Sequence, residues 1–244
     1  FPIHIKLDTG MHRLGFAPQD VPELIARLKR QTSVIPRSVF SHLAGSDGDQ
    51  FDSFTRKQIE TFEKASEELQ SAFPHKILRH ICNTAGIQRY PGAQFEMVRL
   101  GLGLYGVDPY TNQMLHNVST LKTTILQIRD VPQEDSVGYS RKGRLNRDSR
   151  IAAIPIGYAD GLNRRLGNGN AYCLVNGQKA PYVGNICMDV CMIDVTDIDC
   201  REGDKVIIFG DDLPVTVLSD VLETIPYEIL TSVSNPVKTI YYQD

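Results

Sequence analysis

The sequence predicts an α/β domain followed by an all-β domain, on three observations. Residues 1–115 alternate short apolar strands with amphipathic helices, the pattern of a parallel sheet with right-handed crossovers. Residues 116–244 lack long helical stripes and contain β-branched segments separated by turn residues. Polar residues end each early strand, as at the carboxyl-terminal face of a barrel. We therefore expect half of a (β/α)8 TIM-like barrel over 1–115 and a mostly β C-terminal domain over 116–244.

Four strands and three helical stretches are expected in the first domain. In Ile3–Asp8 the apolar residues share one parity and the polar residues the other, so one face packs while the other carries charge. The other strands are Ser38–Leu43, Ile77–Cys82 and Phe95–Leu100. The helices are Val21–Leu28, a long helix with the apolar stripe Phe51, Phe54, Ile59, Phe62, Ala65 and Leu69, and a short stretch after Thr84. We interpret the stripe as packing against the sheet.

The second domain is expected to be built mainly from strands. These are Thr120–Ile128, Arg150–Ile156, Tyr172–Val175, Ile186–Val195 and Val237–Tyr242, with one short helix over Val217–Leu222. Asn176 and Gly177 stand between two β runs. Because both residues tolerate positive φ, they predict a two-residue hairpin turn.

Composition excludes several classes of protein. A net charge of -3 argues against general nucleic-acid binding, though not against one local anion site. The five cysteines have no paired metal-ligand spacing, so we expect reduced thiols in a cytoplasmic protein, with neither a metal site nor disulfides. No apolar run is long enough to span a membrane. The chain starts at Phe1, almost inside a strand, which suggests the later part of a longer polypeptide.

Polar side chains stand at the ends of all four expected strands of the first domain: Lys6 and Asp8, His42, Asn83 and Thr84, and Arg99. A single histidine or arginine has an ordinary structural explanation, but four such positions in register favour a site. The loops Asn83–Gly86 and Gly101–Gly103 offer hydroxyl and backbone donors for a phosphate. Because barrels often bind phosphate after their seventh and eighth strands, these units would form the second half of the barrel.

Five longer motifs carry a family resemblance: HIKLDTGMHRLGF, NTAGIQRYP, MVRLGLGLYG, PIGYADGLNRRL and VGNICMDVCMIDVTD. Together they resemble bacterial alanine racemase, a pyridoxal-phosphate enzyme with a barrel and a C-terminal β domain, over nearly the whole chain. The resemblance implies interconversion of L- and D-alanine for peptidoglycan synthesis by a homodimer in the full-length protein. No nucleic-acid or membrane partner is expected.

The resemblance also implies roles for individual residues. Arg99 would face the pyridine nitrogen of pyridoxal 5'-phosphate and keep it unprotonated, and His42 would link Arg99 to the catalytic base Tyr139 of the second subunit. The cofactor-binding set is Asn83, Thr84, Arg99, Gly101 and Leu102. The substrate-binding set is Arg13, Lys6, Tyr158, Arg164, Cys187, Met188 and Asp189. In this set Lys6, which can be carbamylated, would position Arg13, and Arg13 would hold the substrate carboxylate.

One element of the family pattern is missing. The Schiff-base lysine of the family lies in a motif like Val-Lys-Ala-Asn-Ala-Tyr-Gly-His-Gly, and that motif is not present in this chain. We therefore expect the 244-residue chain to be inactive alone. Smaller departures are Thr84, where serine is common, and Asn185 and Asn235, where many relatives carry arginine and tyrosine.

Three alternatives remain open on the sequence. The first is that the parent chain is a fusion of a cell-wall ligase with a racemase, which the abrupt start permits but does not demonstrate. The second alternative is another pyridoxal-phosphate enzyme with the same architecture, such as a broad amino-acid racemase or a decarboxylase. Arg99 and the narrow entrance at Tyr158 argue against it. The third is a non-catalytic dimerisation fragment.

Overall fold

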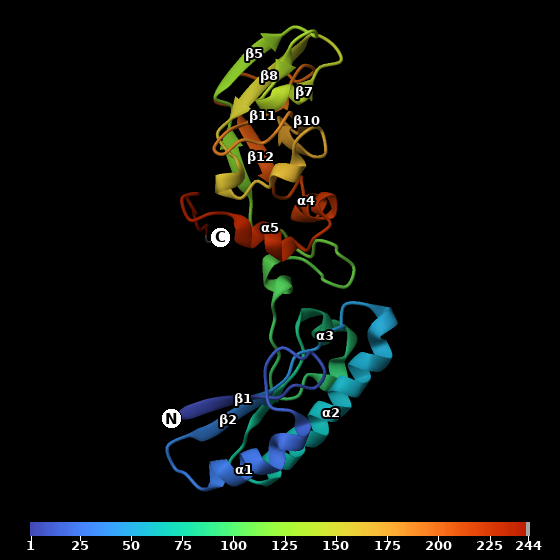
Figure 1. The fold of residues 1–244 in the computed structure, drawn as a ribbon, viewed down its shortest axis with the longest axis vertical. Helices are drawn as coiled ribbons and strands as arrows, with labels where there is room; N and C mark the ends of the chain where they lie inside the picture. Colours follow the sequence, from blue (N-terminus) through green and yellow to red (C-terminus); the bar gives the residue numbers. More distant parts are fainter. Residues whose placement is uncertain (243–244) are drawn as a thin grey trace. The chain divides into compact units, whose positions relative to one another are not determined.

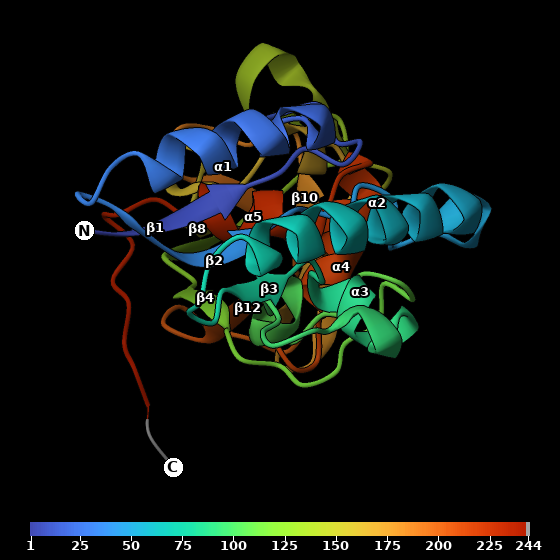
Figure 2. The ribbon, with the colours of Figure 1, turned by 90° about the horizontal axis from the view of Figure 1, so that it is seen from below.

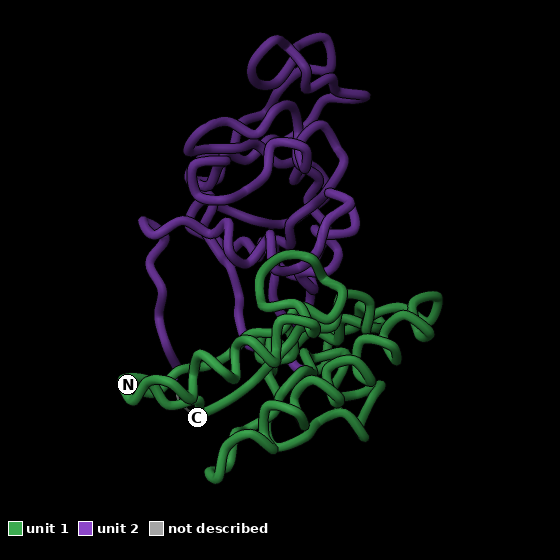
Figure 3. The backbone as a smooth tube through the Cα atoms, turned by 60° about the horizontal axis from the view of Figure 1, so that its bottom comes forward, with its two compact units in different colours: residues 1–115 green, residues 116–244 purple. Residues whose placement is uncertain are grey.

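The computed structural model describes residues 1–242, and the chain divides between Leu115 and His116 into two units (Figure 3). We call residues 1–115 unit 1 and residues 116–244 unit 2.

Unit 1 is a parallel sheet covered on one side by helices. Its strands pair in the order β1-β2-β3, with β1 at Pro2–Lys6, β2 at Ile35–Phe40 and β3 at Leu78–His80. Its helices are α1 (Val21–Lys29), α2 (Asp52–Ser71) and α3 (Thr84–Arg89), with 3-10 turns at Pro18–Asp20, Asp49–Phe51, Pro91–Ala93 and Leu102–Tyr105. Helices α1 and α2 lie along the same side of β1 and β2 (Figures 1 and 2).

Side-chain alternation divides this sheet into an apolar and a polar face. Ile5 and Val39 are buried in one core with Phe62 and Leu69 of α2, and burying side chains of this size is the main source of stability. On the opposite parity, Lys6 pairs in register with Phe40, and Phe40 pairs with His80. The expectation that one face packs while the other carries polar groups is confirmed for β1.

The expected fourth strand, Phe95–Leu100, is not a strand in the structure. Phe95 has a φ of 49°, which interrupts an extended conformation, and no regular ladder follows it. Two backbone bonds still hold the segment beside the third strand: Glu96 donates to the Arg79 carbonyl at 3.3 Å and Arg99 to the Cys82 carbonyl at 3.0 Å. The segment therefore places Arg99 next to β3 without extending the sheet.

Unit 2 contains a seven-stranded sheet in the order β4-β12-β9-β10-β11-β8-β5. The strands are β4 (Leu121–Thr124), β5 (Gln127–Val131), β8 (Ser149–Ile154), β9 (Tyr172–Val175), β10 (Gln178–Val183), β11 (Cys191–Asp194) and β12 (Lys205–Phe209). A separate ribbon pairs β6 (Ser136–Val137) with β7 (Gly143–Arg144), and the helices are α4 (Val215–Leu222) and α5 (Pro226–Ser232). Further 3-10 turns are Tyr139–Arg141, Tyr158–Asp160 and Arg164–Leu166.

The two outer strands of this sheet are consecutive in the chain. Ile125 donates to the Asp204 carbonyl at 3.0 Å, beside β12, and Leu126 donates to the Ala153 carbonyl at 2.8 Å, in β8. The backbone therefore leaves one edge of the sheet and joins the other within one residue step. The expected strand Thr120–Ile128 is for this reason two strands rather than one.

Other expectations in unit 2 had mixed outcomes. The hairpin is confirmed: Asn176 and Gly177 have φ values of 49° and 76° and connect β9 to β10. Only part of Ile186–Val195 is a strand, because a turn closed by Cys187 N–H to the Val190 carbonyl at 3.1 Å precedes β11. The predicted strand over Val237–Tyr242 is wrong, since these residues pair with no strand of the described chain. Strand β12 and helix α5 were not anticipated.

Within residues 1–242, none of the helices combines the length and the apolar character needed to cross a bilayer. The same residues contain no group of three or more histidine, cysteine or carboxylate side chains that would suit a metal ion.

Candidate functional site

The guanidinium of Arg99 is the centre of the polar face of unit 1. Nη1 donates to His80 Nδ1 at 2.6 Å and to the His80 carbonyl at 3.2 Å. Nη2 donates to the Ser41 carbonyl at 2.6 Å, the Ile81 carbonyl at 3.2 Å and His42 Nδ1 at 3.2 Å. All of these acceptors are neutral, and no carboxylate of the described residues forms an ion pair with Arg99. The site therefore holds a half-buried cation without a counter-ion, and burial lowers the pKa of Arg99.

These bonds fix the tautomers of two histidines. Because Arg99 donates to Nδ1 of both His42 and His80, each neutral imidazole must carry its proton on Nε2. Burial and the charge of Arg99 lower the pKa of both rings to about 4. Nε2–H of His80 donates to Ser38 Oγ at 3.2 Å, and Ser38 Oγ is 2.7 Å from Nδ1 of His4. Nε2 of His42 therefore carries a proton that this ring can donate to another group.

Phe40 supports the same cluster through its ring. The ring of His80 stacks on that of Phe40, with centroids 5.0 Å apart. The Arg99 guanidinium lies 5.4 Å from the Phe40 centroid and Lys6 Nζ lies 5.9 Å from it, both within cation–π range. Sequence reasoning missed both Phe40 and His80. The parity of their strands was the available signal, since each pairs in register on the face that carries Lys6.

The loop after β1 carries Arg13. Its base is closed by two backbone bonds, from Asp8 N–H to the Phe16 carbonyl at 2.8 Å and from Phe16 N–H to the Lys6 carbonyl at 2.9 Å. The Asp8 carboxylate accepts from the amides of His12 and Gly10, each at 3.0 Å, and these bonds lower its pKa. The charges of Arg13 and Lys6 also act on His42, adding to the effects that lower its pKa. The neutral imidazole of His42 is therefore close to three positive charges, those of Arg99, Arg13 and Lys6.

A donor cradle lies at the start of α3. Thr84 Oγ1 accepts from the amides of Gly101 at 2.9 Å and Gly103 at 3.3 Å, so its hydroxyl proton is available to a ligand. Asn83 caps the helix, its Oδ1 accepting from Gly86 N–H at 3.0 Å. A Cβ on residue 103 would lie 2.9 Å from Thr84 Cγ2, so a side chain there would disturb the cradle. Leu102, between the two glycines, is buried, with 6% of its surface exposed.

This donor set fits pyridoxal phosphate at two points. The hydroxyl proton of Thr84, whose oxygen already accepts two amides, suits a phosphate group. The Arg99 cation, which has no carboxylate partner among the described residues, suits an unprotonated ring nitrogen. Both groups of donors belong to unit 1.

In unit 2, two loops bring the expected entrance and substrate residues together. Tyr158 N–H donates to the Cys187 carbonyl at 3.0 Å, and Ala159 N–H donates to the Met188 carbonyl at 3.0 Å. A Cβ on residue 157 would lie 2.2 Å from the Met188 carbonyl oxygen, so only glycine permits this approach. The side chains of Met188, Asp189 and Arg164 are exposed.

Tyr139 is attached to the same region through Asn185. The Nδ2 of Asn185 donates to the Tyr139 carbonyl at 3.3 Å, while its Oδ1 accepts from Asn168 Nδ2 at 3.1 Å. Asn185 thus joins the turn at Tyr139 to Asn168. The tyrosine ring itself is 71% exposed. Gly138 before it, with a φ of 76°, directs the chain into this turn. Asn235, the other departure, is exposed.

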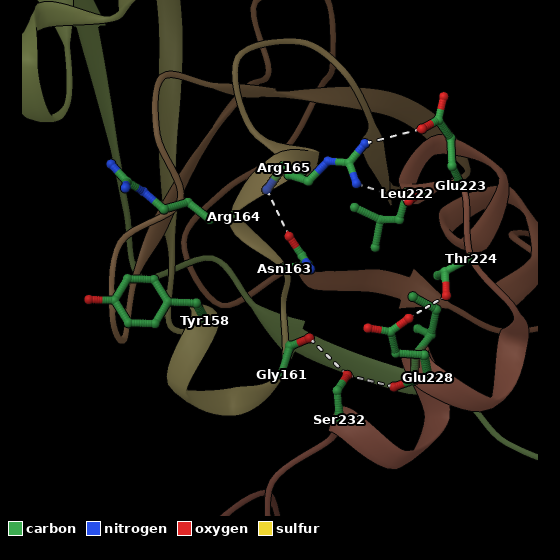
Figure 4. A pocket seen from close by; sticks show the side chains of 11 residues that line it. Tyr158, Gly161, Asn163, Arg164, Arg165, Leu222, Glu223, Thr224, Glu228 and Ser232 are labelled. Carbon is green, nitrogen blue, oxygen red and sulfur yellow. Dashed lines mark hydrogen bonds and ion pairs between the residues drawn. The ribbon is translucent and has the colours of Figure 1, made fainter.

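A pocket of about 490 Å³ opens beside Tyr158 in unit 2 (Figure 4). Tyr158 and Arg164 project on one side of it, whereas Arg165 and Glu223 lie on the other. Arg165 donates to the Leu222 carbonyl at 3.1 Å and lies 3.6 Å from the carboxylate of Glu223. Arg165 therefore has protein partners, whereas Arg164 extends from the pocket.

The expected site residues are therefore divided between the two units. Unit 1 contains Lys6, Arg13, His42, Asn83, Thr84, Arg99, Gly101 and Leu102. Unit 2 contains Tyr139, Tyr158, Arg164, Cys187, Met188 and Asp189.

Comparison with known proteins identifies related sequences for both units. Residues 1–109 match the family model described as "Alanine racemase, N-terminal domain", and residues 118–241 match "Alanine racemase, C-terminal domain". Alanine racemase 1 of Clostridium acetobutylicum is 38% identical, and the alignment covers 99% of this chain and 65% of that protein. The chain thus spans about 65% of the length of this curated relative.

Solved structures agree with this assignment. Alanine racemase from Streptomyces lavendulae matches with a TM-score of 0.91 at 28% identity, over all of this chain and 66% of that one. The Bartonella henselae alanine racemase, solved with covalently bound pyridoxal phosphate, matches with a TM-score of 0.86 at 33% identity, over 99% of this chain and 67% of that one. The expected fold class, a partial α/β barrel region followed by a β-rich domain, is confirmed. The chain belongs to the alanine racemase family.

Proposed function

We propose that this chain supplies most of the active site of a pyridoxal-phosphate-dependent enzyme that interconverts L- and D-alanine. The observation that carries the proposal is the environment of Arg99, a cation held only by neutral acceptors beside a phosphate-type donor cradle. A carboxylate at this place would favour a protonated ring nitrogen and deeper electron withdrawal. Arginine restrains that withdrawal, which suits racemisation better than decarboxylation.

Unit 1 binds and orients the cofactor in this proposal. Thr84, Asn83 and the backbone at Gly101 and Leu102 hold the phosphate. Pyridoxal phosphate supplies, when bound, an electron-accepting ring that makes the α-hydrogen of an amino acid acidic. Arg13 binds the substrate carboxylate, and Lys6 or its carbamate positions Arg13.

Unit 2 supplies the base that acts on L-alanine. Tyr139 Oη takes the proton from the α-carbon on one face, and a lysine supplied outside these residues returns a proton on the other. A donor such as Nε2–H of His42 would help to stabilise the phenolate form of this tyrosine. Tyr158 and Arg164 narrow the approach, and Cys187, Met188 and Asp189 complete the substrate pocket.

In the family these unit 2 groups come from the second subunit, so we propose that the working form is a homodimer. We also propose that the present chain is inactive alone. None of its ten lysines, Lys6, Lys29, Lys57, Lys64, Lys76, Lys122, Lys142, Lys179, Lys205 and Lys238, lies in a motif like that of the Schiff-base lysine.

The test compares two proteins by circular dichroism of L-alanine solutions with added pyridoxal phosphate. One is this chain, and the other, called here the extended protein, joins the lysine-bearing first segment of the C. acetobutylicum relative to Phe1. The extended protein should convert L-alanine to the racemate, and the chain alone should not. An extended protein that folds and binds the cofactor, yet leaves L-alanine unchanged, would overturn the proposal.

A further inference from the structure

Ser46, which lies between β2 and α2, contacts both ends of helix α3. Its hydroxyl donates to Asn83 Oδ1 at 2.8 Å, at the amino-terminal cap of the helix. Its carbonyl accepts from Nη1 of Arg89 at 2.9 Å, at the last residue of the helix. Ser46 is 1% exposed. One buried residue therefore fixes the position of α3 against the loop that follows β2.

Arg89 is itself held by several partners. Its Nη2 donates to Asp52 Oδ1 at 2.7 Å and also to Asp49, and its guanidinium lies 4.5 Å from the ring centroid of Tyr110. Asp52 accepts a further bond from the Tyr90 hydroxyl at 2.6 Å. The Arg89 side chain is only 11% exposed. This arginine therefore joins the start of α2, the end of α3 and the segment near Tyr110.

The same helix begins with the donor cradle. Thr84 is the first residue of α3, and its Oγ1 accepts the amides of Gly101 and Gly103. Asn83 Oδ1 receives two bonds, one from Gly86 N–H at 3.0 Å and one from Ser46. Movement of α3 would displace Thr84 relative to those glycines. A shift of about 1 Å in a binding group is enough to weaken a site severely.

We propose that Ser46 and Arg89 are positioning residues for the phosphate cradle at Thr84 and Gly101. This inference rests on the proposed function and adds to it. Neither residue is placed against the ligand. Ser46 acts through Asn83, and Arg89 acts through Ser46 and the carboxyl end of α3. The affinity for the phosphate part of the cofactor depends on them, whereas the affinity for the pyridine ring depends on Arg99.

The experiment measures two dissociation constants in the extended protein by calorimetry, one for pyridoxal phosphate and one for pyridoxal, which lacks the phosphate. Ser46→Ala removes the hydroxyl but keeps the carbonyl that Arg89 uses. We expect the dissociation constant for pyridoxal phosphate to rise about tenfold, as for loss of one buried hydrogen bond, with that for pyridoxal unchanged. Arg89→Gln should act in the same direction, and Arg89→Lys should recover part of the loss.

Ser66→Ala is the matched control, because Ser66 is also fully buried, at 0% exposure, and bonds the Glu63 carbonyl of α2 at 3.0 Å. It should lower thermal stability without changing the ratio of the two constants. A Ser46→Ala protein that keeps the wild-type ratio overturns the positioning role alone. An extended wild-type protein that binds neither compound overturns this inference together with the proposed function.

Discussion

Arg99 and His80 are joined by a short hydrogen bond in the polar cluster of unit 1, with Nη1 donating to Nδ1 at 2.6 Å. Because an arginine only donates, His80 has to be the acceptor and its ring has to be neutral. The bond therefore couples the position of the guanidinium to the protonation state of a histidine.

The first prediction concerns the histidine tautomers. In long-range ¹H–¹⁵N spectra at pH 7, His42 and His80 should both show the Nε2–H form, because their Nδ1 atoms accept from Arg99. Titration should give pKa values of about 4 for both rings. A Nδ1–H tautomer at His80 would contradict the assigned network.

The second prediction is a dependence of stability on pH. The folded pKa of each ring is lowered from 6.5 to about 4, so below pH 6.5 the unfolded chain binds protons that the folded chain does not. The free energy of unfolding of unit 1 should fall as pH drops from 6.5 towards 4 and level off below. Each ring contributes less than about 3.5 kcal/mol, which is the lowering of its pKa from 6.5 to about 4 at about 1.4 kcal/mol per pKa unit, because both rings are only partly shielded from solvent. Hydrogen exchange of the α2 amides measures this, and His80→Gln should flatten the slope.

The third prediction tests Tyr139 as the base for L-alanine. In the extended protein, Tyr139→Phe should reduce kcat from L-alanine by about 100-fold or more, the usual contribution of a general base. Tyr241→Phe is the control, since Tyr241 belongs to the same unit and is 90% exposed. It should retain wild-type turnover. Near-normal turnover by Tyr139→Phe would remove this residue from its proposed role.

The fourth prediction tests the contact between the two loops of unit 2. Gly157→Ala should destabilise unit 2 by about 1–3 kcal/mol, the range for overpacking, because its Cβ would lie 2.2 Å from the Met188 oxygen and 2.4 Å from the Cys187 oxygen. Gly92→Ala is the control, as nothing lies within 4 Å of its Cβ position. Chemical denaturation of both variants measures the difference. Equal stability of the two would show that the loops can separate at no cost.

The sequence was informative wherever a local pattern decides the structure. The stripe through Phe62 and Leu69 predicted α2, and Asn176-Gly177 predicted the hairpin, because helix periodicity and turn chemistry are properties of neighbouring residues. Phe95–Leu100 reads as a strand in the same way. Its irregularity follows from the positive φ of Phe95, a conformation that a phenylalanine rarely adopts and that no local pattern indicates.

The site shows the same limit. Lys6 ends β1, His42 follows β2 and Thr84 begins α3, so their grouping could be predicted from strand order. Arg99 was expected at the end of a fourth strand, and it joins this group although its segment is not a strand. His80 could not be assigned a role in this way, because its bond to Arg99 depends on how a side chain from another segment is oriented. Ser46 and Arg89 were missed for a related reason. The bond between Arg89 and Ser46 joins a loop to the end of a helix, and no sequence spacing predicts such a contact.

The edge-to-edge step at Ile125–Leu126 has a consequence for biosynthesis. Strand β4 pairs with β12, which begins only at Lys205, so Leu121–Thr124 leaves the ribosome long before its hydrogen-bonding partner exists. At a translation rate of about 5–20 residues per second, this delay is roughly 4 to 16 s. Unit 2 is thus expected to close its sheet only after Lys205–Phe209 has been synthesised, so β4 stays unpaired on that side during the interval.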